Sequence, residues 1–194
     1  PQWLLALMIF LGAQMLVRLW AGEALERDES EQVLWAQQLA LGFGTQPPLY
    51  TWLQRAVFEV VGVSVLGLTL LKHGLIALTY LFTYAAARTL MPAALAALAS
   101  ASMLLLPRMS VDSHRDLTHV VLCTTLTAAT FWVLLALRRR QTPWAYAALG
   151  LVVGLGLLSK YSYVLVALAL LLALSTAPDT RALLLHRGMA LALA

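Results

Sequence analysis

Three groups of side chains in this apolar sequence have types suited to proton transfer or anion binding. Asp28 and Glu29 are adjacent carboxylates, and a positioned carboxylate can take a proton from a hydroxyl. Arg115 adjoins Asp116, and a guanidinium group can hold a phosphate through two parallel hydrogen bonds. Lys160 interrupts a long apolar stretch, where a lysine costs roughly 2.5–3.5 kcal/mol at mid-membrane, so an anionic partner is expected.

Each group also has a purely structural interpretation. Asp28 can cap a helix together with Glu31, three residues further on. Lys160 can extend its amine to the lipid headgroups. Arg108 and His114 can be ordinary loop residues. The residues alone leave these alternatives open.

A metal site has less support. Asp112, His114 and Asp116 lie two residues apart, but no second histidine accompanies them at ligand spacing. No cofactor is therefore certain from the sequence, and a bound divalent cation stays open.

The composition predicts a membrane protein. Apolar residues make up 61% of the chain and charged residues 11%, against ~45–50% and ~25% in soluble domains. The net charge of +4 is spread through the apolar sequence, whereas a nucleic-acid partner would require cations gathered on one polar face. With one cysteine, Cys123, neither a disulfide framework nor a cysteine metal cluster is available.

Six apolar stretches are candidate membrane spans, at about 3–21, 70–89, 92–109, 117–137, 144–158 and 161–175. The last two are predicted as a hairpin, because a single helix over 144–174 would reach ~46 Å across a ~30 Å hydrocarbon core. A compact run of arginines at 138–140 indicates the cytoplasmic side, which places the loop 22–69 outside. The missing initiator methionine and the short final apolar run predict the amino-terminal part of a longer chain.

The first external loop, 22–69, contains two amphipathic patterns. One runs from Asp28 to Gly42, and the other starts at the paired prolines Pro47 and Pro48. Both are expected to lie along the outer membrane interface with their apolar sides down. They would hold Asp28 at the interface, facing water.

Read in order, these features resemble the family 39 glycosyltransferases of the GT-C fold, which include aminoarabinose transferases and protein O-mannosyltransferases. The resemblance covers essentially the whole chain. It rests on Asp28-Glu29-Ser30-Glu31, Trp35 and Gln38, Gln46-Pro47-Pro48-Leu49-Tyr50-Thr51-Trp52, the loop 108–116, and Gly154-Leu155-Gly156-Leu157-Leu158-Ser159-Lys160-Tyr161.

The resemblance implies an all-α polytopic transmembrane bundle in the bacterial inner membrane, with its site on the external face. It implies transfer of a sugar, with inversion, from a polyprenyl-phosphate carrier to a lipid, glycan or protein acceptor. Because a phosphate leaves without a proton donor, one base is enough.

The same resemblance assigns roles to particular residues. Asp28 is the expected base, and Glu29 would position the acceptor or a metal. Lys160 and Arg115 would hold the phosphate, and either Asp112 or Asp116 corresponds to the family's second-loop aspartate. Tyr161 completes the substrate-binding motif.

One departure concerns the residues before the paired prolines. The aminoarabinose branch has Glu-Lys there, which supplies metal and phosphate contacts, whereas this chain has Thr45 and Gln46. Those contacts do not transfer, although Gln46 can hydrogen-bond a sugar hydroxyl. Lys72 and His73, at the entrance of the second span, are expected to face lipid and cap the helix end, with the lysine snorkelling; contact with a phosphate or a sugar is the alternative.

Two other classes of function compete with the enzyme. A transporter or flippase of a lipid-linked sugar would also have short paired helices with an intramembrane lysine, but transporters usually keep their polar site near the midplane. The third class is a membrane subunit without catalytic activity. The gathering of ionisable residues at one interface favours chemistry on a lipid headgroup.

Overall fold

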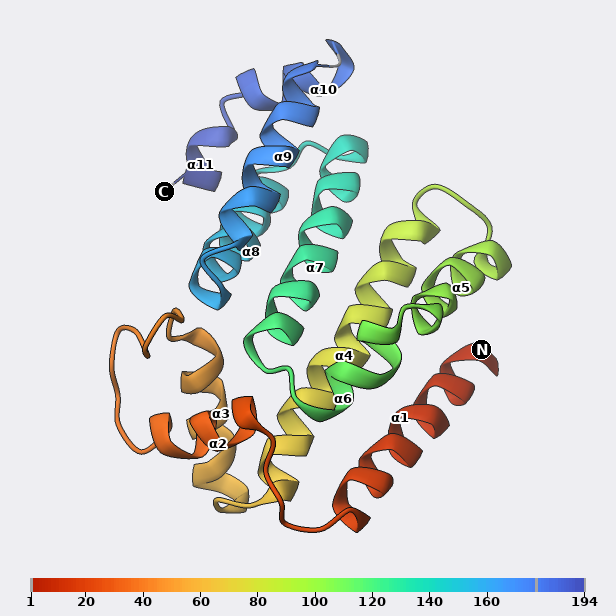
Figure 1. The fold of residues 1–194 in the computed structure, drawn as a ribbon. Helices are drawn as coiled ribbons and strands as arrows, with labels where there is room; N and C mark the ends of the chain where they lie inside the picture. The colour runs from red at the N-terminus through yellow and green to blue at the C-terminus, as the bar shows by residue number, and fades with distance from the viewer. Residues whose placement is uncertain (1, 177, 194) are drawn as a thin grey trace.

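The computed structural model describes residues 2–176 and 178–193, and the described chain is helical apart from its connections and one isolated β-bridge between Phe43 and Gln46 (Figure 1). The helices are α1 (Gln2–Trp20), α2 (Arg27–Trp35), α3 (Leu49–Val61), α4 (Val65–Arg88), α5 (Ala93–Ala101), the 3-10 helix η1 (Ser102–Leu105), the π-helix η2 (Arg108–Asp112), α6 (Ser113–Arg115), α7 (His119–Arg139), α8 (Pro143–Ser159), α9 (Tyr163–Thr176), α10 (Pro178–Leu185) and α11 (Met189–Leu193).

Three described helices, α1, α4 and α7, are long and apolar enough to cross a membrane. The stretch predicted as one span at 92–109 is instead a broken pair, 93–105 and 108–115, bent by 83°. Pro107 explains the break, because proline has no N–H to donate and keeps Leu106 in an extended conformation (φ −87°, ψ 115°).

The predicted hairpin limbs correspond to two shorter helices. α8 has 17 residues and α9 has 14, which gives lengths of about 26 Å and 21 Å at ~1.5 Å per residue. The chain leaves α8 at Lys160 and re-enters a helix at Tyr163, so the turn of the hairpin carries the lysine.

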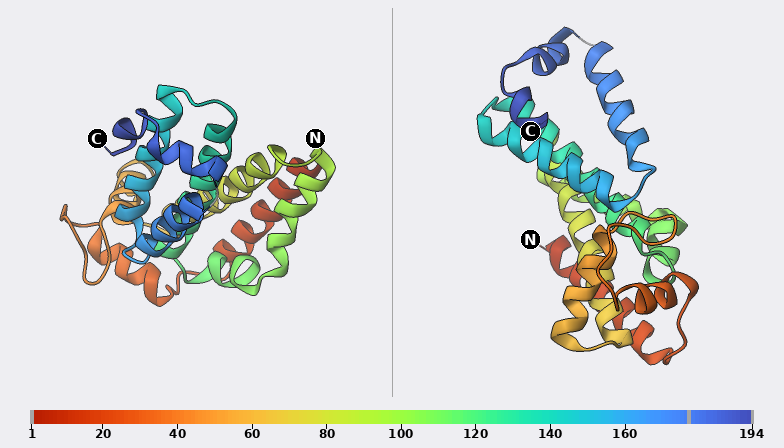
Figure 2. Two further views of the ribbon diagram at one scale, coloured as in Figure 1. Left: turned by 90° about the horizontal axis from the view of Figure 1, so that it is seen from above. Right: turned by 90° about the vertical axis from the view of Figure 1, so that its left-hand side faces the viewer.

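α4 is the central helix of the bundle. It packs against α1, α3, α5 and α7, and α7 in turn packs against α8. The Oγ1 atoms of Thr79 and Thr125 lie 2.8 Å apart and join α4 to α7 inside the core. Figure 2 shows α9 to α11 at one end of the molecule, and α1 to α3 with their connections at the other.

The first loop differs from the predicted one at α2, and the span after it begins earlier than predicted, whereas α3 follows the paired prolines as expected. α2 begins at Arg27 and ends at Trp35, well before Gly42. Asp28 does not cap it: the residue before the helix is Glu26, whose backbone N–H donates to Glu29 Oε2 at 3.3 Å. α4 begins at Val65 rather than 70, because the Ser64 hydroxyl accepts a bond from the Gly67 N–H and starts the helix.

Candidate active site

Asp28 joins the first loop to the segment that precedes α7. Its Oδ2 lies 3.4 Å from both the backbone N and the Oγ1 of Thr118, which donate to it. The Asp28 N–H donates to Asp116 Oδ1 at 3.1 Å. Burial, and then the negative charge of Asp116, raise the pKa of Asp28 above its usual value. The start of α2 is therefore held against the segment before α7, where the carboxyl groups of Asp28 and Asp116 lie close enough to interact electrostatically.

Glu29 lies on the opposite, inner side of α2. Its side chain is completely buried and accepts bonds from Arg18 Nη2 at 2.5 Å and from Lys72 Nζ at 2.8 Å. Burial alone would raise the pKa of Glu29, but the hydrogen bond from Arg18 and the charge of Lys72 outweigh it, so the pKa is lowered. We call Arg18, Glu29 and Lys72 the buried ion cluster. It fastens α2 to both α1 and α4.

The contacts of Glu29 argue against the metal contact that the sequence left open for it. Both of its oxygens are engaged by cationic side chains, an environment that does not fit a ligand of a divalent cation. Within residues 2–176 and 178–193, no group of three or more His, Cys, Asp or Glu side chains is arranged to hold a metal ion.

The expectation that Lys72 and His73 face lipid is wrong. Lys72 is 1% exposed, and besides Glu29 it donates to the backbone carbonyl of Arg115. His73 is buried against His114, with 3.1 Å between His73 Nε2 and His114 Nδ1. The partners of Lys72 lie 43 residues away in either direction along the chain, so no local sequence pattern connects them.

The structure distinguishes Asp116 from Asp112, the two second-loop aspartates that the sequence left as alternatives. Asp116 contacts Asp28, whereas Asp112 lies exposed in η2. Arg115 directs its Nη2 to Glu26 Oε1 at 2.5 Å, and its side chain is 68% exposed. Arg108 is also exposed. The residues 115 and 116 are therefore the ones that lie against α2.

Lys160 reaches the same end of the molecule through the turn after α8. It is half-buried, and within the described chain its amine forms no ion pair. The preceding carbonyl, of Ser159, lies 3.4 Å from His119 Nδ1, and His119 directly follows Thr118, which bonds Asp28. The contact between His119 and Ser159 thus links Thr118, the partner of Asp28, to the residue before Lys160.

A buried polar chain that the sequence did not reveal supports this arrangement. His119 Nδ1 faces a carbonyl, so this nitrogen donates and Nε2 accepts from the Gln32 amide at 3.1 Å. The Gln32 oxygen accepts from Thr51 Oγ1 at 3.0 Å. The chain connects α2, α3, α7 and α8. Nothing in the local sequence marks Gln32 for this role, because its partners His119 and Thr51 lie on other helices.

Gln46 and Tyr161 lie beside one another at the edge of this region. A Cβ atom added to Gly42 would lie 3.6 Å from the Gln46 carbonyl oxygen and 3.9 Å from Tyr161 Oη. Gln46 is half-buried, and Tyr161 is 62% exposed. The tip of the hairpin therefore approaches the turn before the paired prolines.

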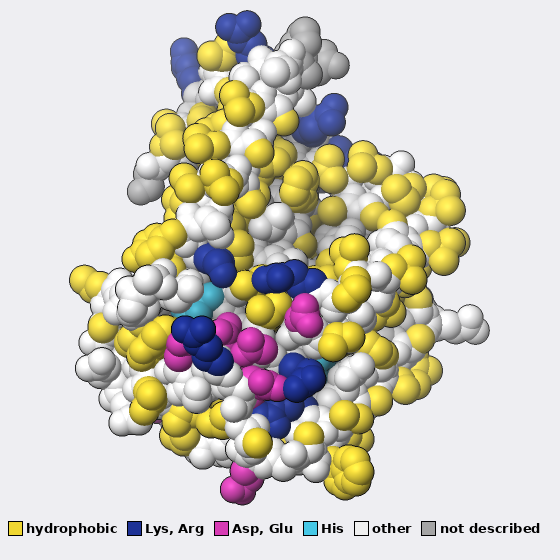
Figure 3. All heavy atoms as spheres, viewed as in Figure 1, with side chains coloured by type: hydrophobic (Ala, Val, Ile, Leu, Met, Phe, Trp, Pro, Cys, Tyr) yellow, Lys and Arg dark blue, Asp and Glu magenta, His cyan; other side chains and the backbone are white. Residues whose placement is uncertain are grey.

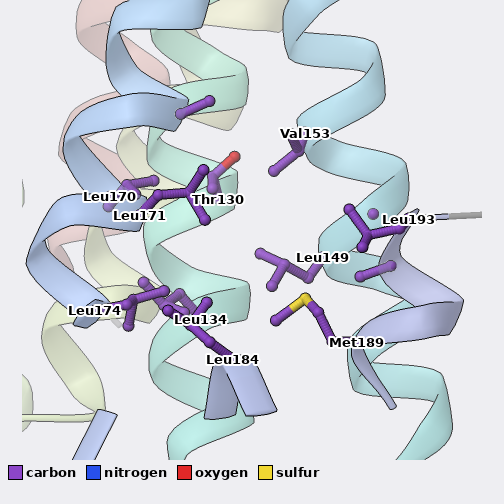
Figure 4. A pocket seen from close by; sticks show the side chains of 13 residues that line it. Thr130, Leu134, Leu149, Val153, Leu170, Leu171, Leu174, Leu184, Met189 and Leu193 are labelled. Atoms are coloured by element: carbon purple, nitrogen blue, oxygen red, sulfur yellow. The ribbon is translucent and has the colours of Figure 1, made fainter. Parts of the chain in front are cut away.

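Seen from one side, cationic and acidic side chains gather in a band at the level of α2 and α6, below a largely apolar surface (Figure 3). An apolar pocket of about 140 Å³ lies elsewhere, between α7, α8, α9 and the last two helices. Thr130 is the one polar side chain among those labelled in Figure 4. This pocket offers no titratable group, so the charged band is the candidate site.

Comparisons with known proteins place this all-α bundle of apolar helices in the GT-C class of membrane glycosyltransferase folds. Residues 45–194 match the family described as dolichyl-phosphate-mannose-protein mannosyltransferase, and the chain belongs to this family. The resemblance and the all-α GT-C fold predicted from the sequence are confirmed.

Two relatives come from Rhizobium johnstonii. The lipopolysaccharide core galacturonosyltransferase RgtB is 38% identical over 90% of this chain, and RgtA, of the same description, is 34% identical over 88%. The chain spans 36% and 34% of their lengths. The structure of ArnT from Cupriavidus metallidurans bound to undecaprenyl phosphate has the same fold, with a TM-score of 0.76 at 19% identity over 99% of this chain and 39% of that one.

Proposed function

We propose that this chain is the amino-terminal part of a membrane enzyme that moves a sugar from a polyprenyl-phosphate carrier to a glycolipid on the external face of the bacterial inner membrane. The observation that carries the proposal is the position of Asp28. This half-buried carboxylate has a raised pKa and bonds Thr118, whose neighbour His119 contacts the carbonyl of Ser159, the residue before Lys160. A base and a cation at one membrane surface suit transfer from a phosphate.

In this mechanism Asp28 accepts the proton of the acceptor hydroxyl. The hydroxyl oxygen attacks the anomeric carbon from the side opposite the phosphate, and the bond between that carbon and the phosphate oxygen breaks. The phosphate leaves with the bonding electrons, and the ammonium group of Lys160 stabilises its negative charge. Attack from the opposite side inverts the anomeric configuration.

The remaining site residues surround these two. Asp116 fixes the backbone of Asp28 through its N–H. Gln46 and Tyr161 lie on the Lys160 side, where they would contact the donor sugar. Arg115 is placed near Asp28 through its bond to Glu26, and an exposed guanidinium suits an anionic substrate group. Glu29 acts through the buried ion cluster, by holding α2.

The relatives favour a particular pair of substrates. Both are described as galacturonosyltransferases of the lipopolysaccharide core, and the ArnT structure contains undecaprenyl phosphate. We therefore propose galacturonic acid as the transferred sugar and a lipopolysaccharide core sugar as the acceptor.

Mass spectrometry of envelope lipids from cells with and without the full-length gene tests this proposal. We expect the lipopolysaccharide core to lose the mass of one or more galacturonic acid residues when the gene is deleted, and to regain it with the wild-type gene. Unchanged core masses would contradict the proposed acceptor. In reconstituted vesicles, movement of the polyprenyl-phosphate sugar across the bilayer with no transfer product would instead identify a transporter.

A further inference from the structure

A cavity of about 480 Å³ lies between the end of α1, the link from α1 to α2, and the segment 110–115. Its polar lining comes from Gln14, Arg18, Glu26, Ser110, His114 and Arg115. Glu26 is two residues from Asp28, and Arg115 adjoins Asp116. The cavity is therefore next to the candidate base. Figure 1 shows α1 and α6, which border it, on one side of the start of α2, and the α8–α9 turn that carries Lys160 toward the other.

The hydrogen bonds of two histidines determine what the cavity offers a ligand. His73 Nδ1 lies 3.0 Å from the carbonyl oxygen of Thr69, which can only accept, so this nitrogen carries the hydrogen. His73 Nε2 is then a bare acceptor, and His114 Nδ1 must donate to it across 3.1 Å. His114 Nε2 is consequently left with a lone pair and no hydrogen.

This lone pair has nothing to bond among residues 2–176 and 178–193. His114 is 3% exposed, and its Nε2 is a buried atom without a hydrogen-bond partner in the described chain. Burial, and then the nearby His73 and Lys72, lower the pKa of His114 to about 4, so the ring is neutral at pH 7 and the nitrogen remains an acceptor. Buried acceptors are normally satisfied, and His114 is one of the residues that line the cavity.

We propose that this cavity is the subsite for the acceptor sugar, and that a sugar hydroxyl donates a hydrogen bond to His114 Nε2. An ionised phosphate or carboxylate has no hydrogen to give to this atom, whereas a hydroxyl has one. The inference rests on the proposed function, because it assigns the cavity side of Asp28 to the acceptor and the Lys160 side to the donor phosphate. Arg115 and Glu26 form the polar rim of the subsite.

Kinetics of the full-length enzyme in lipid nanodiscs test the subsite, with purified core oligosaccharide as acceptor and polyprenyl-phosphate-linked galacturonic acid as donor. His114→Phe removes the accepting nitrogen, and His114→Gln restores an accepting oxygen. Ala21→Trp fills the cavity from an exposed position without touching the histidines. Leu39→Trp places a tryptophan at an exposed position of the first external loop that does not line the cavity.

We expect His114→Phe and Ala21→Trp each to raise the KM for the oligosaccharide about tenfold, the effect of losing one hydrogen bond. His114→Phe removes the bond itself, and Ala21→Trp blocks the sugar from reaching it. The KM for the donor should stay unchanged in both, and His114→Gln should recover most of the acceptor affinity. Leu39→Trp should behave as the wild type. Because Ala21→Trp leaves the histidine pair intact, it remains informative even if His114→Phe does not fold.

Two results would overturn the subsite. If Ala21→Trp and the His114 variants leave the acceptor KM unchanged, the cavity holds water only. If they raise the donor KM instead, the two sides of Asp28 are reversed. Direct binding of the oligosaccharide, measured without donor, separates this proposal from the broader one. If the wild type binds it and Ala21→Trp does not, but no transfer product forms once the donor is added, the subsite is retained and the proposed activity is rejected.

Discussion

At the scale of single residues, Asp28 is distinguished from the other acids of the first loop by its contacts. Glu29 is fully buried between cations, and Glu23 is exposed, whereas Asp28 is half-buried and bonded to Thr118. We predict that Asp28→Asn lowers kcat by about 10²–10⁴-fold, the usual contribution of a general base. Transfer assays with the full-length protein measure this, with Glu23→Gln as a matched control. Activity of Asp28→Asn equal to that of the control would exclude Asp28 as the base.

Asp116 provides a second prediction, because its charge helps to raise the pKa of Asp28. A base works in its ionised form, so the rate is lost as the pH falls through its pKa. Replacing the charge in Asp116→Asn lowers the pKa of Asp28 and moves the acid limb of the pH–rate profile to lower pH. The asparagine oxygen still accepts from the Asp28 N–H, which keeps the geometry. A limb that does not move, or moves upward, would contradict the assignment.

The buried ion cluster leads to a prediction about stability. Removing one partner of a buried ion pair typically costs ~3–5 kcal/mol, because the other charge is left uncompensated. Glu29→Gln leaves the buried charges of Arg18 and Lys72 without their anionic partner. We therefore expect a large drop in the thermal unfolding midpoint in detergent. The double variant Glu29→Gln with Lys72→Met should recover part of it. Equal stability of wild type and Glu29→Gln would show that the cluster contributes nothing.

The lowered pKa of Glu29 also fixes the direction of a pH effect. An acid whose pKa is depressed by folding stabilises the protein above the pKa of the unfolded chain, and this contribution is lost as the pH falls through the folded value. Unfolding midpoints measured from pH 7 downward should therefore fall more steeply for the wild type than for Glu29→Gln.

At the scale of helices, the sequence predicted the apolar segments well and their ends less well. Hydrophobic runs define α1, α4 and α7 because lipid requires long apolar helices. The broken pair around Pro107 was read as one helix, although the proline marked the break. The start of α4 at Val65 depends on the Ser64 cap, which a hydropathy pattern does not contain.

Two glycines in α8 give a prediction for the hairpin. A Cβ atom at Gly156 would lie 2.2 Å from the ring of Tyr163, whereas one at Gly154 would have nothing within 4 Å. Gly156→Ala must therefore push α9 away from α8, and overpacking of this kind costs about 1–3 kcal/mol. We expect lower thermal stability, and lower donor affinity because Lys160 lies in the same turn. Gly154→Ala is the control, and equal behaviour of the two variants would contradict this packing.

At the scale of the whole molecule, the candidate site could be predicted in part. The family motifs led to Asp28 and Lys160 by residue type and order, and they left Asp112 and Asp116 as alternatives for the second loop. Lys72, Gln32 and Thr51 were missed or misassigned, because their partners come from distant helices. A lysine at a helix entrance has the same sequence signature whether it faces lipid or an acid on another helix.

The proposed orientation of the molecule is tested by labelling engineered cysteines in a Cys123→Ser background. Leu39→Cys lies in the first loop, and Gln141→Cys follows the arginines at 138–140; both positions are exposed. We predict that a membrane-impermeant thiol reagent labels Leu39→Cys in intact spheroplasts and Gln141→Cys only after lysis. The reverse pattern would put Asp28 on the cytoplasmic side and reject an external site.

The buried ion cluster also has a consequence for biogenesis. Arg18 belongs to α1 and Glu29 to α2, but Lys72 belongs to α4 and is made 43 residues after Glu29. In the proposed external orientation, the Glu29 carboxylate crosses the bilayer before Lys72 is made, so the cluster is completed only after α4 has entered the membrane. Docking of α2 is accordingly a late event of insertion, and a nascent chain stalled before Lys72 would hold the first loop undocked.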